Sequence, residues 1–231
     1  MNEKIYLSHR GNWHNNAIEN TISSFTATRE KLNNKLHGFE CDFQQLDAEK
    51  EDSWIIFHDE TMKRLNPNET TINIEKRIYQ NNQSDKIPTL TEFCDWVKEN
   101  NQNIIVNIEI KKGTKIGIKY LIQTLNEANI NSDVKFIYSS FSNEIMSQLS
   151  NYNEHIGYLV DDQNEVDILA KKSLSVRTLF IAMSYENRSF INRLNELNNS
   201  YGIYFSSLES YKNNIETVEN DPSVKYIFIE A

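Results

Sequence analysis

Short apolar runs rich in β-branched and aromatic residues recur along the chain, and most are separated by a polar segment of helix length. This alternation is the strongest constraint on the fold, because strands that alternate with helices form βαβ units and a parallel sheet. The sequence contains nine such runs: KIYLS, HGFECDF, WIIFH, NIIVNIEI, KFIYSS, HIGYLV, TLFIAMS, GIYFSS and KYIFIEA. We therefore expect an α/β fold.

The run WIIFH, at residues 54–58, does not fit the alternation. Only the charged stretch QQLDAEKEDS separates it from the run before it, which is marginal for a parallel crossover but ample for an antiparallel return. Without it eight runs remain, the strand number of a TIM (β/α)8 barrel. We predict one TIM-barrel domain over residues 1–231, with a small insertion after strand 2 at about 44–89. Its weakly periodic part, Glu60 to Thr89, is predicted to be an insertion or a lid.

Composition excludes several classes of protein. Hydrophobic residues make up 39% of the chain, enough to fill one core, and the formal charge of -9 disfavours binding to nucleic acid or to an anionic membrane. The first residues lack an apolar signal segment, and no run approaches the roughly 18 apolar residues of a membrane span. We expect a cytoplasmic protein without stable membrane insertion, of unknown oligomeric state. Cys41 and Cys94 have no metal-ligand spacing and are predicted to be core thiols.

Acidic residues alternate with apolar ones in two of the runs. Glu40 and Asp42 are two positions apart, so both point to one face of their strand, and Asn107, Glu109 and Lys111 alternate in the same way. Acids on the inner face of a barrel need a compensating charge. The three carboxylates together predict a hard oxygen site for Mg²⁺ or Ca²⁺, whereas each one alone is more simply a solvated strand end.

Two histidines stand at the ends of predicted strands. His9 ends the first strand, and His58 ends the hairpin arm just before Asp59. Taken singly, each is more simply a packed or surface residue, but beside three acids they could act as general acid and general base. Arg10 and Lys111 are candidates for binding a phosphate, with ion pairs to the acids as the equal alternative.

Seven short motifs carry these residues in chain order: HRG at 9–11, ENT at 19–21, ECD at 40–42, HD at 58–59, IPTLTEF at 87–93, NIEIK at 107–111 and SSF at 139–141. The ordered set resembles the glycerophosphodiester phosphodiesterase family over roughly the first 140 residues. HRG or HD alone would mean little, whereas the order makes the likeness specific. Glu19 matches a motif position, and Asn20 beside it is either a helix N-cap or part of the site.

The resemblance implies a metal-dependent phosphoric diester hydrolase of lipid metabolism with a TIM-barrel fold. Its substrate would be a small glycerophosphodiester, cleaved to an alcohol and glycerol phosphate. The implied metal ligands, for Mg²⁺ or Ca²⁺, are Glu40, Asp42 and Glu109. The implied acid–base pair is His9 and His58, and the implied phosphate contacts are Arg10 and Lys111. Supporting positions are Glu19, Asp59 and Asn107.

Three alternatives stay open. A phospholipase D or lyase of the same superfamily would form a cyclic phosphate by attack of the substrate's own hydroxyl, and a noncatalytic relative would only bind a phosphate ligand. A nuclease would also use histidines and a metal, but the acidic charge balance argues against a long polyanion. The sequence does not determine which histidine is the base, nor the alcohol of the substrate.

The chain departs from the family pattern mainly at its C-terminal end. The family usually shows a Trp-Thr-x-Asn stretch and a final strand resembling Gly-x-Asp-Gly, where this sequence has YFSSLES and VKYIFIEA. Tyr204 or Phe205 is a candidate replacement for the tryptophan as an apolar wall for the leaving alcohol. Ile18 replaces a proline, and AEKEDS replaces an Asp-Gly turn, which are tolerable loop changes.

Overall fold

The computed structural model of the chain describes residues 3–11, 18–32, 36–64, 71–72, 85–100, 102–152, 155–170, 179–182, 192–193, 196 and 200–230. Strands and helices alternate along most of this part of the chain, as the sequence predicts. None of the helices within it is both long and apolar enough to cross a membrane.

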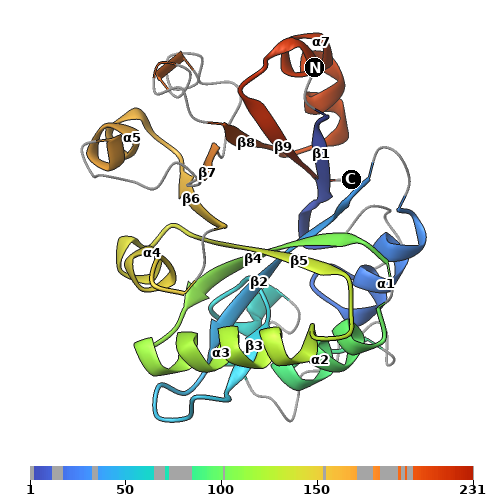
Figure 1. Cartoon of the computed structure of the whole chain (residues 1–231), viewed down its shortest axis with the longest axis vertical. Coiled ribbons are helices and arrows are strands. Elements are labelled where there is room, and N and C mark those ends of the chain that lie inside the picture. Colours follow the sequence, from blue (N-terminus) through green and yellow to red (C-terminus); the bar gives the residue numbers. More distant parts are fainter. Residues whose placement is uncertain are drawn as a thin grey trace.

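Parallel strands form a closed ring. They are β1 (Ile5–Ser8), β2 (Gly38–Gln45), β4 (Ile104–Lys112), β5 (Val134–Ser140), β6 (Ile156–Val160), β7 (Leu179–Ala182), β8 (Tyr201–Phe205) and β9 (Val224–Ile229). Each strand pairs with the next in this order, and β1 pairs with both β2 and β9, which closes the ring. The α/β class and the predicted TIM barrel are therefore confirmed, with helices around the strands (Figure 1).

Helices connect successive strands: α1 (Ile22–Glu30), α2 (Leu90–Lys98), α3 (Lys115–Ala128), α4 (Asn143–Leu149), α5 (Gln163–Ala170) and α7 (Leu208–Asn220). Several begin at a serine or threonine whose side chain accepts a hydrogen bond from a backbone N–H three residues later. Because the first N–H groups of a helix have no partner within the helix, these caps determine where it starts. The capping residues of α2, α3, α4 and α7 are Thr89, Thr114, Ser142 and Ser207.

The run at residues 54–58 is not a barrel strand. It contains β3 (Trp54–Ile56), which pairs with β2 in the antiparallel direction, as predicted from the short connection. Ile55 and Phe57 pack with Met62 and Ile87 in a small separate apolar cluster. Of the insertion predicted at about 44–89, residues 65–70 and 73–84 lie outside the described residues.

The apolar core has two layers. The larger layer lies between strands and helices, and alternate residues of β2 (Phe39, Cys41 and Phe43) belong to it. A smaller inner cluster, consisting of Leu7, Leu159, Ile181 and Phe228, comes from inward-facing strand positions. Cys41 and Cys94 are buried and not disulfide-bonded, as predicted. Because Phe39, Cys41 and Phe43 face outward, Glu40 and Asp42 between them face the interior of the ring.

Candidate active site

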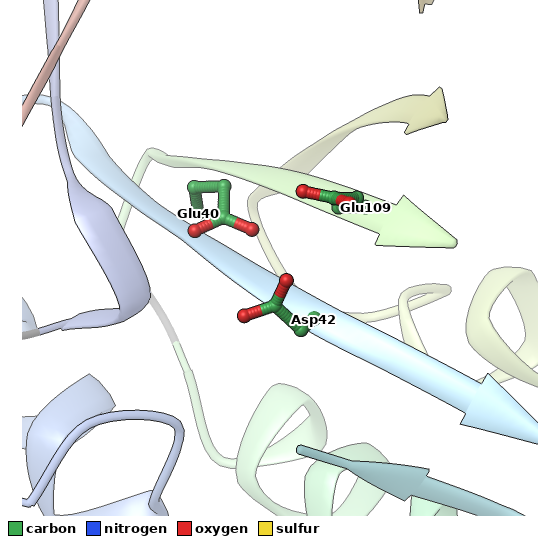
Figure 2. A group of neighbouring side chains, drawn as sticks. All are labelled: Glu40, Asp42 and Glu109. Carbon is green, nitrogen blue, oxygen red and sulfur yellow. The ribbon is translucent and has the colours of Figure 1, made fainter. Parts of the chain in front are cut away.

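Three carboxyl groups converge on the inner side of β2 and β4. Asp42 pairs with Glu109 in the register of the two strands, and Glu40 pairs with Asn107, so the four residues lie side by side. Ser8, the last residue of β1, pairs with Phe39, so Glu40 and Asp42 lie beyond the carboxyl end of β1. One carboxylate oxygen each from Glu40, Asp42 and Glu109 lies within 4.8 Å of the other two (Figure 2). The structure therefore brings together the acids that the sequence predicts as metal ligands.

Burial and mutual repulsion make these acids hard to ionise together. Burial, with the charges of Asp42 and Glu109, raises the pKa of Glu40 well above its usual range. Burial, with the charge of Asp42, raises the pKa of Glu109 to about 7. Like charges in a region of low dielectric disfavour the ionised form, so the cluster needs a compensating positive charge.

Two cations lie beside the acids but neutralise them incompletely. Nε of Arg10 is 3.2 Å from Oδ2 of Asp42, and Nζ of Lys111 is 2.9 Å from Oε1 of Glu109 and 3.7 Å from Oδ1 of Asp42. Burial opposes the charge of each cation, but the neighbouring carboxylates outweigh it and raise the pKa of both Arg10 and Lys111. Both candidate phosphate ligands thus remain charged next to the acids.

The donor set fits a divalent cation. Oε1 of Glu40 and Oδ1 of Asn107 are buried, and neither accepts a hydrogen bond from any residue that the structure describes. The two residues are paired across β2 and β4, and Asn107 uses its Nδ2 to donate to Oγ of Ser139 at 2.9 Å. Buried acceptors of this kind are normally satisfied, and hard oxygen atoms are the ligands that Mg²⁺ and Ca²⁺ prefer. Glu40, Asp42 and Glu109 could hold such an ion.

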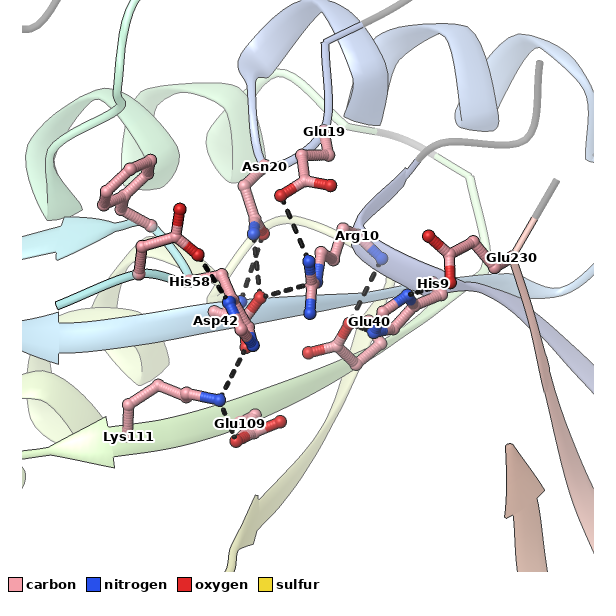
Figure 3. Close-up of polar contacts among 12 residues, drawn as sticks. His9, Arg10, Glu19, Asn20, Glu40, Asp42, His58, Glu109, Lys111 and Glu230 are labelled. Atoms are coloured by element: carbon pink, nitrogen blue, oxygen red, sulfur yellow. Dashed lines mark hydrogen bonds and ion pairs between the residues drawn. The ribbon is translucent and has the colours of Figure 1, made fainter. Parts of the chain in front are cut away.

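The HRG motif forms a tight turn directly after β1. Arg10 has φ 54° and ψ 23°, and Gly11 has φ 70°, which a side chain would strain. A Cβ atom on Gly11 would also lie 2.8 Å from Oγ of Ser24 and 2.9 Å from Cδ1 of Phe25. The turn directs the backbone N–H of Arg10 to Oε2 of Glu40 at 3.1 Å and leaves Nε2 of His9 3.7 Å from the same oxygen (Figure 3).

The ENT motif precedes α1 and contacts the same acids. Thr21, not Asn20, is the N-cap of α1, which corrects the simpler of the two readings of Asn20. Asn20 has φ 56°; its Nδ2 donates to Oδ2 of Asp42 at 2.8 Å, and its Oδ1 accepts from the N–H of Asp42 at 3.1 Å. Glu19 accepts a hydrogen bond from the guanidinium of Arg10 at 3.2 Å. Both residues therefore hold other groups of the site.

The HD motif follows β3 and adds the second histidine. Nδ1 of His58 lies 2.8 Å from Oδ1 of Asp59. Gln44 on β2 donates to the carbonyl groups of Phe57 and Asp59 at 2.6 and 2.9 Å and so ties this loop to the barrel. His58 lies close enough to His9 for its charge to affect the pKa of that residue. Burial, followed by the charge of Arg10, lowers the pKa of His9 to about 3.

The two candidate replacements for the family's tryptophan lie on opposite sides of β8. Phe205 is buried in the outer layer, where its ring packs against Tyr211 with centroids 5.5 Å apart, so it does not line the site. Tyr204 packs with the inner residues, its ring centroid 4.6 Å from that of His9. Its hydroxyl donates to Oε2 of Glu230 at 2.5 Å.

Sequence reasoning assigned no role to three residues that complete the arrangement, Gln44, Ser139 and Glu230, and did not predict the contacts that Asn20 and Tyr204 make. Some signal was present, because Gln44 continues the two-residue alternation of Glu40 and Asp42, and Ser139 lies in the SSF motif. Glu230 had none, since a single acid at the end of the last apolar run has no partner in the sequence.

Together, the fold and these contacts define a TIM barrel with a cluster of buried acids on β2 and β4, beyond the carboxyl end of β1, that could hold a cation. His9 and His58 lie in the turns that follow β1 and β3. No protein-family model and no curated protein matches the sequence. Solved structures do match, over 98% of the chain.

A glycerophosphodiester phosphodiesterase from Agrobacterium tumefaciens has a TM-score of 0.66 and 17% identity, with 94% of that chain covered. Another from Parabacteroides distasonis has a TM-score of 0.68 and 16% identity, with 92% covered. A phosphodiesterase from Oleispira antarctica, solved in complex with the product sn-glycerol-3-phosphate, has a TM-score of 0.66 and 17% identity, with 92% covered. At these identities the likeness establishes the shared fold.

Proposed function

We propose that the protein is a metal-dependent phosphodiesterase that hydrolyses a small glycerophosphodiester to an alcohol and glycerol phosphate. The observation that carries the proposal is the convergence of Glu40, Asp42 and Glu109 within 4.8 Å. His9, His58 and the two cations, Arg10 and Lys111, lie around them (Figure 3). Similar structures include a glycerophosphodiester phosphodiesterase and a phosphodiesterase with bound sn-glycerol-3-phosphate, which supports the same substrate class.

The acids would hold Mg²⁺ or Ca²⁺, which when bound supplies positive charge to the phosphoryl oxygens and offsets the repulsion between carboxylates and an anionic substrate. Arg10 would contribute a guanidinium to the phosphate from the turn after β1, and Lys111 an ammonium from the end of β4. Both are already held in a charged state by Asp42 and its neighbours. Their role is to stabilise negative charge as it develops on the phosphoryl group.

His9 and His58 would transfer the protons. One imidazole removes the proton of the attacking hydroxyl or water, and the other protonates the leaving oxygen. Asp59 orients His58 through the 2.8 Å contact to Nδ1, which leaves Nε2 for the substrate. Asn20 and Glu19 hold Asp42 and Arg10 in position for these steps.

A lyase that forms a cyclic phosphate is the second candidate, since the same groups would serve attack by the neighbouring hydroxyl of the substrate's glycerol. Proximity favours this internal attack. Phosphorus NMR of the product separates the two reactions, because a hydrolase yields a phosphomonoester and a lyase yields the cyclic diester.

The activity is tested on a panel of glycerophosphodiesters that includes glycerophosphocholine, glycerophosphoethanolamine and teichoic-type fragments, with Mg²⁺, with Ca²⁺ and with a chelator. We expect turnover that the chelator abolishes and that His9→Ala or His58→Ala lowers at least about a hundredfold, the usual contribution of acid–base catalysis. Tyr201→Phe, at the other end of β8, serves as the control and should keep its activity. Binding of the panel without product over hours would instead indicate a noncatalytic binding protein.

A further inference from the structure

Tyr204 and Glu230 meet beside His9, and the proposed chemistry assigns them no role. We propose that they form a positioning pair that fixes His9 as the tautomer with its proton on Nδ1 and turns Nε2 toward the carboxylate cluster. An effect of the pair on catalysis rests on the proposed function, whereas the position of the proton on Nδ1 of His9 is independent of it.

The strand register brings the three residues together. Ser8 pairs with Ile229 across β1 and β9, so the residues that follow them, His9 and Glu230, lie next to each other. Tyr204 pairs with Phe228 across β8 and β9, two residues before Glu230, and both Tyr204 and Phe228 pack in the inner cluster. The side chain of Glu230 therefore approaches His9 from the end of β9, which pairs with β1, and that of Tyr204 from β8, the next strand of the ring.

The direction of the hydrogen bonds follows from the number of protons. A phenol hydroxyl has one proton to donate, and an ionised carboxylate can only accept. The hydroxyl of Tyr204 donates to Oε2 of Glu230 at 2.5 Å, so its oxygen presents a lone pair to Nδ1 of His9, 3.4 Å away. Oε2 of Glu230 itself lies 3.9 Å from Nδ1. Nε2 also faces an acceptor, Oε2 of Glu40, but that oxygen is farther away, at 3.7 Å, and already accepts the backbone N–H of Arg10. The nearer acceptor is the hydroxyl of Tyr204, so we place the proton of the neutral ring on Nδ1.

The opposite edge of the imidazole carries Nε2, the atom that is left to exchange a proton with the substrate. Nε2 lies 3.7 Å from Oε2 of Glu40, on the side of the carboxylate cluster. The ring of Tyr204 packs on His9 at an interplanar angle of 61° and restricts its rotation. His9 is only 9% exposed, so solvent has little access to reorient it.

His58 is also supported at Nδ1 by a carboxylate, but without an intervening hydroxyl. Its Nδ1 contacts the carboxylate of Asp59 directly. Nδ1 of His9 reaches the carboxylate of Glu230, which lies beside His9 in Figure 3, through the hydroxyl of Tyr204. Both imidazoles thus direct Nε2 away from a supporting acid. A fixed tautomer with a supporting hydrogen bond is the usual requirement for a histidine that accepts or donates a proton at one defined atom.

The test is long-range proton–nitrogen NMR of the full-length protein labelled with ¹⁵N-histidine, at about pH 8, above the ordinary pKa of histidine. The His9 signals are assigned by their loss in His9→Asn. In the wild type we expect the proton of His9 on Nδ1. Tyr204→Phe keeps the ring but removes the acceptor, so a mixture of tautomers is expected. Glu230→Gln can donate to the hydroxyl, which then donates to Nδ1, so the tautomer with its proton on Nε2 is expected to gain population.

Tyr201→Phe is the matched control, because Tyr201 is also on β8 and its hydroxyl also donates to a carboxylate, Oδ2 of Asp221, at 2.6 Å. It should leave the His9 signals unchanged. With an active substrate, Tyr204→Phe should lower kcat at least about tenfold and leave KM nearly unchanged, as the loss of a supporting hydrogen bond typically does.

The NMR measurement separates this proposal from the proposed function, because it needs no turnover. A wild-type His9 with its proton on Nε2, or a tautomer that Tyr204→Phe does not alter, would overturn the positioning pair even in an active enzyme. A higher KM at unchanged kcat in Tyr204→Phe would also overturn it, since that result indicates a substrate contact.

Discussion

At the scale of single residues, the site contains buried carboxyl groups whose ionised forms are unfavourable without a nearby cation. Glu40 and Glu109 are buried beside Asp42, and Oε1 of Glu40 accepts no hydrogen bond within the described part of the chain. Burial of an unpaired acceptor or charge opposes folding. Such an arrangement persists where it serves binding, and here it has the geometry of a cation site.

The metal-free protein should reveal this cost through Glu109. Burial raises its pKa from 4.5 to about 7, so the folded state keeps a proton that the unfolded state has already lost. The contribution to stability is therefore present below pH 4.5 and is lost as the pH rises through about 7, a change of about 3 kcal/mol. We expect Glu109→Gln to gain stability relative to the wild type across this range.

Urea unfolding in chelator at a series of pH values measures that difference. The lowered pKa of His9 gives an opposite trend, but it acts in both proteins and largely cancels. Added Mg²⁺ or Ca²⁺ should stabilise the wild type much more than Glu109→Gln. A difference that does not change with pH would contradict the raised pKa.

At the scale of elements, the start of α1 connects a helix to the acids of β2. Thr21 caps the helix in a reciprocal pair of hydrogen bonds with Ser24, while Asn20, one position earlier, makes two hydrogen bonds to Asp42. The N–H of Asn20 also donates to the carbonyl of Arg10 at 2.8 Å. The two adjacent residues thus have separate roles: Thr21 stabilises the helix, and Asn20 positions a proposed metal ligand, Asp42.

Substitutions at Asn20 and Thr21 should separate the effect on ion binding from the effect on helix stability. Asn20→Gly tolerates the φ of 56° but loses both side-chain hydrogen bonds to Asp42, so we expect at least about a tenfold loss of Mg²⁺ or Ca²⁺ affinity by calorimetric titration. Thr21→Ala is the control: it removes the cap, at about 1 kcal/mol of stability, and should bind the ion nearly as well. Equal effects of the two variants on ion affinity would argue against a specific role for Asn20.

At the scale of the whole molecule, closure of the ring brings distant parts of the sequence to one site. The order β8, β9, β1, β2, β4 and β5 around the ring is also the order of Tyr204, Glu230, His9, the β2 acids, Glu109 and Ser139. The inner cluster, consisting of Leu7, Leu159, Ile181 and Phe228, joins strands from both ends of the chain. The ring should therefore unfold as one unit.

Phe228→Ala tests this cooperativity. Phe228 is 3% exposed, and its removal should leave a cavity that costs about 3–5 kcal/mol of stability. Unfolding followed by circular dichroism and by tryptophan fluorescence should shift together, because Trp54 and Trp96 lie on other elements than β9. Phe141→Ala, at a position 43% exposed, is the control and should cost far less. Separate transitions for the two probes would show that the ring is not one cooperative unit.

The sequence by itself determined the class of fold and the main acids. Alternating runs and polar segments predict the barrel, the short charged connection predicts the antiparallel β3, and the spacing of Glu40 and Asp42 places both on one face of β2. These features are local, because the period of a strand and the length of a connection can be read from neighbouring residues.

Only the tertiary structure decided which isolated polar residues join those acids. Asn20 has the character of a helix cap in the sequence but binds Asp42 across the turn, and Tyr204 and Phe205 differ only in which side of β8 they occupy. Glu230 meets His9 because β9 pairs with β1, more than two hundred residues apart along the chain. Such contacts depend on strand register and ring closure, which are set by packing over the whole molecule and not by any short stretch of sequence.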